Sequence, residues 1–216
     1  MKKLTKIIAV MTAAAAITSA LAVSASAQYV IRGPIVYVTT VKPYECGENA
    51  EWAFDKETGV LTIKGTGKMR DFGSEKKVPW RDYADKITNV VIEEGITYIS
   101  NYAFSYCKNL IGVSIPSTVE RIAECAFYHC DALPHIFIPK SVDCIENMAF
   151  GESGLKTISF EGSPNDIHKW AFLLVGREDP CIVYCPDDFS VTSRMRTPKE
   201  WYGGYFNFVF EDDYRD

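Results

Sequence analysis

The chain has 216 residues, of which 47% are hydrophobic, 24% are charged and 13% are aromatic. This composition is that of a globular protein, and it excludes a disordered chain, which would contain fewer apolar residues. The formal net charge of −5 disfavours a nucleic-acid partner, because an acidic surface repels phosphate groups.

Residues 1–27 have the pattern of a signal peptide. Three lysines within the first six residues precede an apolar run over 7–23, and the small residues at 25–27 form a cleavage site. We expect export and cleavage after Ala27, which leaves 20 basic against 28 acidic residues and a net charge of −8. No second long apolar run follows, so we expect that the mature chain does not insert into a membrane.

Two predicted segments precede the central part of the chain. Residues 28–45 have weak strand signals and are interpreted as a leader segment. Residues 46–86 are predicted to form a β-rich N-terminal cap and a degenerate first repeat. The strand-like runs 52–54 and 60–63 flank the turn Asp55–Gly59, which predicts a β-hairpin.

A repeat with spacings of 23, 23 and 22 residues occupies the centre of the chain. Its four predicted units are residues 87–109, 110–132, 133–154 and 155–179. The shared apolar columns are Ile87, Leu110, Leu133 and Leu155; Val90, Val113, Ile136 and Ile158; Ile92, Ile115, Ile138 and Phe160; Ile99, Ile122, Ile145 and Ile167; and the Ala-Phe pairs at 103–104, 126–127, 149–150 and 171–172. A period in the twenties with an L-x-x-L-x-L opening predicts a leucine-rich repeat solenoid.

The residue pattern of each unit predicts one strand and one turn. The alternation of apolar and polar residues predicts a strand with one buried face, and stacked units place these strands about 4.8 Å apart in a parallel sheet. The Ala-Phe pair predicts a short helical or irregular turn. Trp80 is expected to take the position in the first coil that Phe104 takes in the next. We therefore expect an α/β repeat solenoid, a right-handed coil with parallel strands on one face and short helical or irregular turns on the other.

The units resemble the BspA-like class of bacterial leucine-rich repeats. The run I-P-S-T-V-E-R-I-A-E-C-A-F-Y-H-C from Ile115 to Cys130 and its neighbours carry this resemblance. The segments Cys46–Asn49, Gly59–Ile63, Gly65–Met69 and Pro79–Trp80 resemble the region that often precedes such repeats. The resemblance implies surface or host-matrix interaction, or association with other cell-surface molecules.

Residues 180–216 are predicted to form a C-terminal cap. Residues 182–186 predict a final strand, and residues 187–200 predict a polar, partly helical segment. Tyr205–Phe210 predicts an edge strand that ends at the acidic residues 211–213.

Seven cysteines in an exported chain raise the possibility of disulfides. Cys107 and Cys130 share one column, which favours a ladder of buried thiols over a disulfide between neighbouring coils. A pairing of Cys125 with Cys144 requires that the turns of adjacent units point toward each other, and it is disfavoured.

No catalytic, cofactor or metal site is predicted. His129 and Cys130 are adjacent in sequence, which aims their side chains apart, and no third group completes a catalytic set. Cys181 and Cys185 lack the second pair of ligands that a zinc site needs. The motifs of serine hydrolases, zinc proteases and phosphate-binding loops are missing from the sequence.

The candidate binding surface is the outward face of the predicted sheet. Residues between the buried columns should point onto the continuous sheet that solenoids use for recognition. The candidates are Asn89, Val91, Gly112, Ser114, His135, Phe137, Thr157 and Ser159. A competing interpretation covers this face with the terminal segment Tyr205–Phe210. A second column is interpreted as half-buried packing rather than an interaction patch; its members are Tyr102, Cys125, Met148 and Trp170.

These observations predict a secreted, non-catalytic leucine-rich repeat protein. Its expected partner is a protein or glycan ligand at the cell surface or in the host environment. One alternative is a structural or accessory component of a cell-surface assembly. A less favoured alternative is a secreted hydrolase with a site that the sequence motifs do not reveal.

Overall fold

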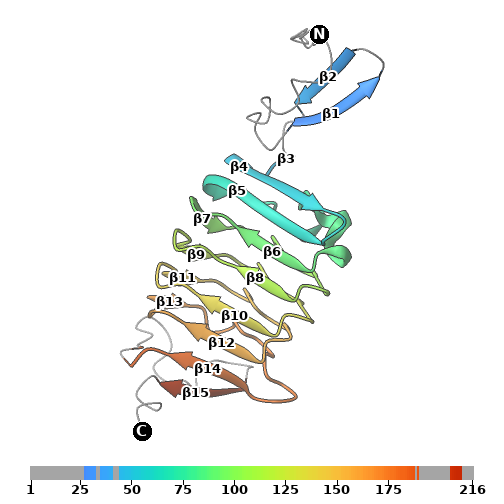
Figure 1. The fold of residues 1–216 in the computed structure, drawn as a ribbon. Coiled ribbons are helices and arrows are strands. Elements are labelled where there is room, and N and C mark those ends of the chain that lie inside the picture. Colours follow the sequence, from blue (N-terminus) through green and yellow to red (C-terminus); the bar gives the residue numbers. More distant parts are fainter. Residues whose placement is uncertain (1–26, 33–34, 41–43, 188, 190–204, 211–216) are drawn as a thin grey trace. The chain divides into compact units, whose positions relative to one another are not determined.

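The computed structural model describes residues 27–32, 35–40, 44–187, 189 and 205–210. The chain divides into two compact units, with the boundary between Pro43 and Tyr44. In the first unit, β1 (Ala27–Arg32) pairs antiparallel with β2 (Ile35–Thr40) (Figure 1). The predicted signal peptide lies outside the described residues, except for Ala27.

The second unit opens with an antiparallel hairpin. Strand β4 (Gly47–Asp55) pairs with β5 (Val60–Met69), and the short β3 (Tyr44–Glu45) pairs with β4. The Gly59 amide donates to the Asp55 carbonyl at 2.9 Å, and the Gly59 φ of 73° lies in the region that favours glycine. The hairpin at Asp55–Gly59 is therefore present as expected. That it protects the end of the repeat stack stays a prediction.

Parallel strands line one side of the coils that follow (Figure 1). In stacking order after β5 they are β6 (Asn89–Ile92), β8 (Gly112–Ser114), β10 (His135–Ile138), β12 (Thr157–Phe160), β14 (Cys181–Cys185) and β15 (Phe206–Phe210). Their register pairs Val90 with Val113, and Ile136 with Ile158 and then Val183. The repeat columns predicted from the sequence are thus aligned across neighbouring strands.

A second ladder of short parallel strands runs along another side of the coils. It continues from the end of β5 through β7 (Ile96–Ile99), β9 (Arg121–Ile122), β11 (Cys144–Ile145) and β13 (Asp166–Ile167). The isoleucine column of this side is fully buried at Ile99, Ile122, Ile145 and Ile167. The sequence predicted only an apolar contact here, because two-residue strands leave no detectable alternation.

Hydrogen-bonded turns, rather than helices, close each coil. Within one coil the Ala103 amide donates to Ser100 and the Ser105 amide donates to Tyr102. The intervening amides instead donate to the next coil: Tyr102 to Glu124, Phe104 to Ala126 and Tyr106 to Tyr128, at 2.7–3.0 Å. Amides along this side therefore bond alternately within their own coil and to the next coil.

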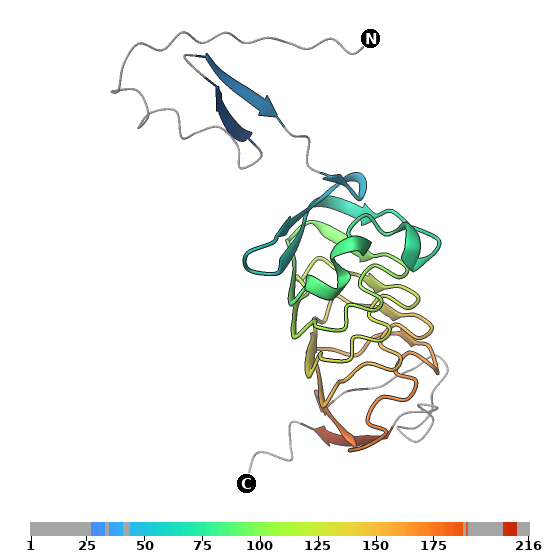
Figure 2. The same ribbon diagram turned by 90° about the vertical axis from the view of Figure 1, so that its right-hand side faces the viewer.

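The backbone of these turns is incompatible with a helix. Tyr102 and Tyr106 both have φ of 59°, and Cys125 and His129 repeat this left-handed conformation one coil later. The expected α/β character is accordingly not confirmed. The helical residues of the described chain are two 3-10 segments before β6, η1 (Glu75–Lys77) and η2 (Arg81–Lys86) (Figure 2).

A stack of aromatic rings forms the centre of the core. Ring centroids are separated by 5.8, 5.2, 5.1 and 5.2 Å along the series Trp80, Phe104, Phe127, Phe150 and Phe172. Trp80 is 1% exposed, and its Nε1 donates to the Ala103 carbonyl at 2.7 Å. Trp80 thus extends the phenylalanine column, as the sequence predicts.

The final coils end in β14 and β15, which pair in parallel register from Cys181 with Phe206 to Cys185 with Phe210. Both strands lie where the sequence predicts extended segments. Apart from Asp187 and Phe189, the segment 187–200, expected to be partly helical, lies outside the described residues, as do the acidic residues 211–213.

Candidate functional site

The predicted candidates lie in two rows on the outward face of the parallel strands. The register aligns Asn89 with Gly112 and Val91 with Ser114. It then aligns His135 with Thr157 and Phe137 with Ser159. We define the outward face as the ten non-core positions of β6, β8, β10, β12 and β14: Asn89, Gly112, His135, Thr157 and Ile182 in one row, and Val91, Ser114, Phe137, Ser159 and Tyr184 in the other.

The outward face exposes apolar side chains between small polar ones. Phe137 is 45% exposed, Val91 37% and Ile182 36%. Ser114 and His135 are also exposed, whereas Asn89, Thr157 and Ser159 are half-buried. Ile182 and Tyr184 were not among the predicted candidates, although the alternation along Cys181–Cys185 could have identified them.

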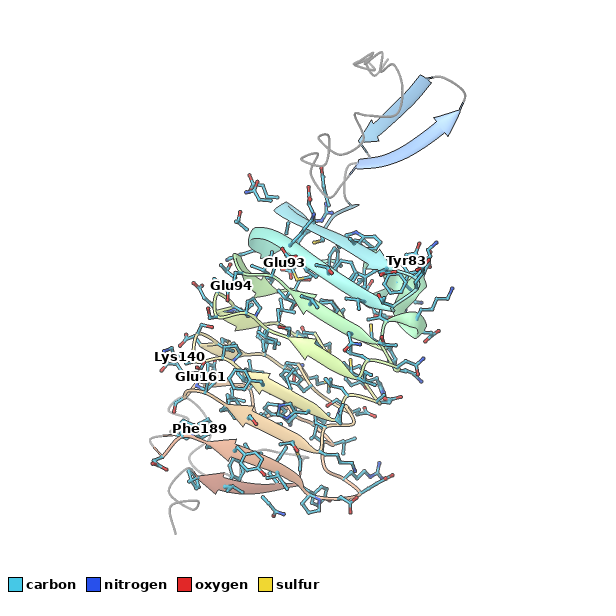
Figure 3. All side chains as sticks on the ribbon, in the orientation of Figure 1. Tyr83, Glu93, Glu94, Lys140, Glu161 and Phe189 are labelled. Atoms are coloured by element: carbon cyan, nitrogen blue, oxygen red, sulfur yellow. The ribbon has the colours of Figure 1, made fainter. Side chains whose placement is uncertain are left out.

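The outward face has no Asp, Glu, Lys or Arg, although such residues make up 24% of the chain. Charged residues gather instead beyond the ends of the strands, where Figure 3 labels Glu93, Glu94, Lys140 and Glu161. Two of these carboxylates accept hydrogen bonds from residues of neighbouring coils. Glu94 accepts from the amide and hydroxyl of Ser117 at 3.1 and 3.0 Å, and Glu161 accepts from the Lys140 amide at 3.0 Å.

The terminal segment does not cover the outward face of β6 to β12. Phe206–Phe210 extends the sheet beyond β14 as a further parallel strand instead. The competing interpretation of Tyr205–Phe210 as a cover is therefore wrong. Backbone pairing with β14 satisfies the hydrogen-bonding groups on one side of the segment, which packing on the face of a sheet would not do.

The second predicted column is mostly packed. Tyr102 and Met148 are half-buried, and Cys125 is 7% exposed. Trp170, at the end of the column, is 41% exposed, and the Lys169 ammonium lies 4.5 Å from its ring centroid. Three of the four residues in this column are therefore packed into the protein, as the sequence interpretation expects.

All seven cysteines are buried free thiols. Cys107 and Cys130 are 1% and 0% exposed, and the Cys130 thiol donates to the Phe104 carbonyl at 3.2 Å. Burial raises the pKa of Cys107 to about 12 and that of Cys125 to about 11. A catalytic thiol needs the opposite shift, because the thiolate is the nucleophile. Burial therefore favours the protonated, less nucleophilic form of Cys107 and Cys125.

A cleft of about 510 Å³ lies beside the turns at His129, which the sequence indicated only as a surface histidine. The two ring nitrogens of His129 lie 3.3 Å from Asp131 Oδ1 and 3.4 Å from Glu152 Oε2. The Tyr128 hydroxyl donates to Glu152 Oε1 at 2.7 Å, and this bond is the main reason that the pKa of Tyr128 is raised.

This cleft offers charge but no activated nucleophile. Its one hydroxyl, on Ser153, is buried and donates to the Phe150 carbonyl at 2.7 Å. In the part of the chain that the structure describes, no cluster of three or more Asp, Glu, His or Cys side chains is arranged to hold a metal ion. No helix of that part is long and apolar enough to span a membrane.

Comparison with known proteins finds a family that matches the repeats. Residues 82–175 match the family described as the BspA type leucine rich repeat region, in six copies. No curated protein matches the chain.

Solved structures of leucine-rich repeat proteins are similar to part of the chain. One from Eubacterium ventriosum is 26% identical, with a TM-score of 0.47, over 57% of this chain and 38% of that chain. One from Bacteroides ovatus is 18% identical, with a TM-score of 0.44, over 67% and 48%. One from T. pallidum is 17% identical, with a TM-score of 0.41, over 65% and 71%. The matches therefore span less than half the length of the first two proteins.

Proposed function

Since residues 82–175 belong to the BspA type of leucine-rich repeats, we propose that this protein is an exported, non-catalytic module that binds a surface ligand. The observation that carries the proposal is the outward face, two rows of exposed and half-buried positions on five stacked parallel strands. Solenoids use such surfaces for recognition, because stacked strands hold many side chains in one fixed array. The pattern of residues 1–27 supports export of the chain.

Phe137 is the proposed anchor of the binding surface. It is the most exposed apolar side chain of the outward face. It lies on β10, the middle one of the five strands, between β8 and β12. Aromatic residues near the centre of an interface commonly dominate binding energy, because they bury a large rigid surface. The hydroxyls of Ser114 and Ser159 occupy the neighbouring positions of its row.

A matched pair of variants tests this proposal. The exported chain, Phe137→Ser and Trp170→Ser are applied to an array of purified extracellular-matrix proteins and of neutral and acidic glycans. Both substitutions remove one exposed aromatic ring, but only Phe137 lies on the outward face. We expect Phe137→Ser to weaken binding about tenfold or more, whereas Trp170→Ser leaves it unchanged. Equal effects of the two variants, or no binding to any arrayed component, would contradict the proposal.

A further inference from the structure

We infer that the ligand of the outward face is a neutral, linear polysaccharide, which lies across the strands over Phe137. This inference rests on the proposed function and names the chemical class of its ligand. It follows from the charge, the functional groups and the dimensions of the face.

The charge of the face excludes ionic recognition. None of its ten positions holds Asp, Glu, Lys or Arg, whereas the chain as a whole is acidic. An anionic polymer would find no lysine or arginine on this face, and a cationic peptide would find no carboxylate. Glu94 and Glu161 beyond the strand ends already accept hydrogen bonds from Ser117 and Lys140. The face is therefore complementary to an uncharged ligand.

The functional groups of the face match those of a sugar. Phe137 offers an exposed ring, and a pyranose presents a face of C–H groups that packs on such a ring. Ser159 is aligned with Phe137, and Thr157 with His135. Each of these hydroxyls both donates and accepts hydrogen bonds, as the hydroxyls of a sugar also do. An aromatic ring bordered by hydroxyl groups thus offers both kinds of contact that a neutral sugar needs.

The backbone of the face disfavours an extended peptide. Peptides commonly join a sheet at its edge, where unpaired amides and carbonyls accept a new strand. The strands β10, β12 and β14 are instead paired with one another in a continuous parallel sheet. A peptide on their outward face would lose the hydration of its own backbone without gaining backbone partners. A polysaccharide has no such obligatory backbone groups.

The ten positions of the outward face offer less area than an interface with a second protein copy would bury. Five strands about 4.8 Å apart, with two rows of side chains about 6.6 Å apart, present about 300 Å². Stable protein interfaces bury about 800 Å² on each partner. The strip is long and narrow, and it continues from Phe137 to Tyr184 over two strand spacings, about 9–10 Å. These dimensions fit one slender chain.

Affinity gel electrophoresis of the exported chain tests the inference. Separate gels contain a soluble linear glucan, a linear mannan or the acidic polymer polygalacturonate. We expect at least one neutral polymer to retard the exported chain and Trp170→Ser equally. We expect Phe137→Ser to raise the dissociation constant about tenfold or more. Binding should change little between about 0.05 M and about 0.5 M NaCl, because no charges need to be screened.

The other outcomes separate the two proposals. Retardation by polygalacturonate alone, or binding that is lost at high salt, overturns the neutral-ligand inference. Phe137-dependent binding to an arrayed protein, without retardation by either neutral polymer, overturns the inference but leaves the proposed function standing. The absence of any Phe137-dependent binding overturns both. A cooperative thermal transition of Phe137→Ser that lies above the temperature of the gels shows that loss of binding is not loss of folding.

Discussion

The phenylalanine column shows how one residue position determines the packing of the coils. Phe127 lies between Phe104 and Phe150, with ring centroids 5.2 and 5.1 Å away, and it is 0% exposed. Phe137, only ten residues later, is 45% exposed on the outward face. The same residue type therefore serves the core at one position and the solvent-facing surface at the other.

Truncation of these two phenylalanines should have very different effects on stability. We expect Phe127→Ala to lower the free energy of unfolding by roughly 3–5 kcal/mol, because it leaves a cavity inside the ring stack. Phe137→Ala should lower it by a smaller amount, about 1–2 kcal/mol, because Phe137 is already 45% exposed in the folded chain. Urea unfolding followed by circular dichroism measures both values. Similar losses for the two variants would show that the ring stack does not dominate the core.

At the scale of elements, the turns stabilise the stack through hydrogen bonds between coils. Met148 has φ of 51°, and its amide donates to the Trp170 carbonyl at 3.1 Å. Left-handed residues orient alternate amides toward the next coil, a direction that a helix would not provide. Non-glycine residues rarely adopt this conformation, and β-branched residues adopt it least. Side-chain type at these positions should therefore affect stability independently of packing.

Substitutions at Met148 test the turn geometry. We expect Met148→Val to be less stable than Met148→Asn by about 1–2 kcal/mol, because asparagine tolerates the left-handed region and valine does not. Lys169, an exposed turn residue outside the positive-φ set, is the matched control, and its Val and Asn variants should show no such preference. Thermal unfolding of the four variants gives the comparison. A valine variant at 148 as stable as the asparagine variant would refute the proposed role of the conformation.

At the scale of the whole molecule, the solenoid buries its thiols along its entire length. Burial raises the pKa of Cys46, Cys107, Cys181 and Cys185 to about 12, against an ordinary value of 9.0. In the unfolded chain these thiols lose their protons above pH 9, whereas the folded chain retains them up to about pH 12. The folded state thus binds more protons over this interval, and stability must fall as pH rises.

The alkaline response provides a test of this burial. With a reductant present, the free energy of unfolding should stay level below about pH 9 and then decline steadily toward pH 11. The double variant Cys181→Ala/Cys185→Ala should show a shallower decline than the unaltered chain, because two of the raised pKa values are removed. Urea titrations at pH 8, 9, 10 and 11 measure the slope. Equal slopes for the two proteins would rule out this contribution of the thiols.

Local sequence patterns determined much of the fold and part of the candidate surface. The spacings of 23, 23 and 22 residues identified the buried columns, because repetition and strand alternation are properties of neighbouring residues. The same alternation placed Val91, Ser114, Phe137 and their row partners outward, and the register confirms their alignment. The resemblance of the repeat to a known family was also visible in the columns alone.

Tertiary structure decided how the coils hold together and where the surface ends. The turns became a hydrogen-bonded ladder, because the amides of Phe104 and Tyr106 find carbonyl partners only when the next coil is stacked beside them. Phe206–Phe210 joined the sheet instead of covering its face, because β14 offers it backbone partners in register. Those outcomes depend on contacts between residues that lie 20 or more positions apart. No local pattern encodes such contacts, whereas the choice of inward and outward side chains is made within each strand.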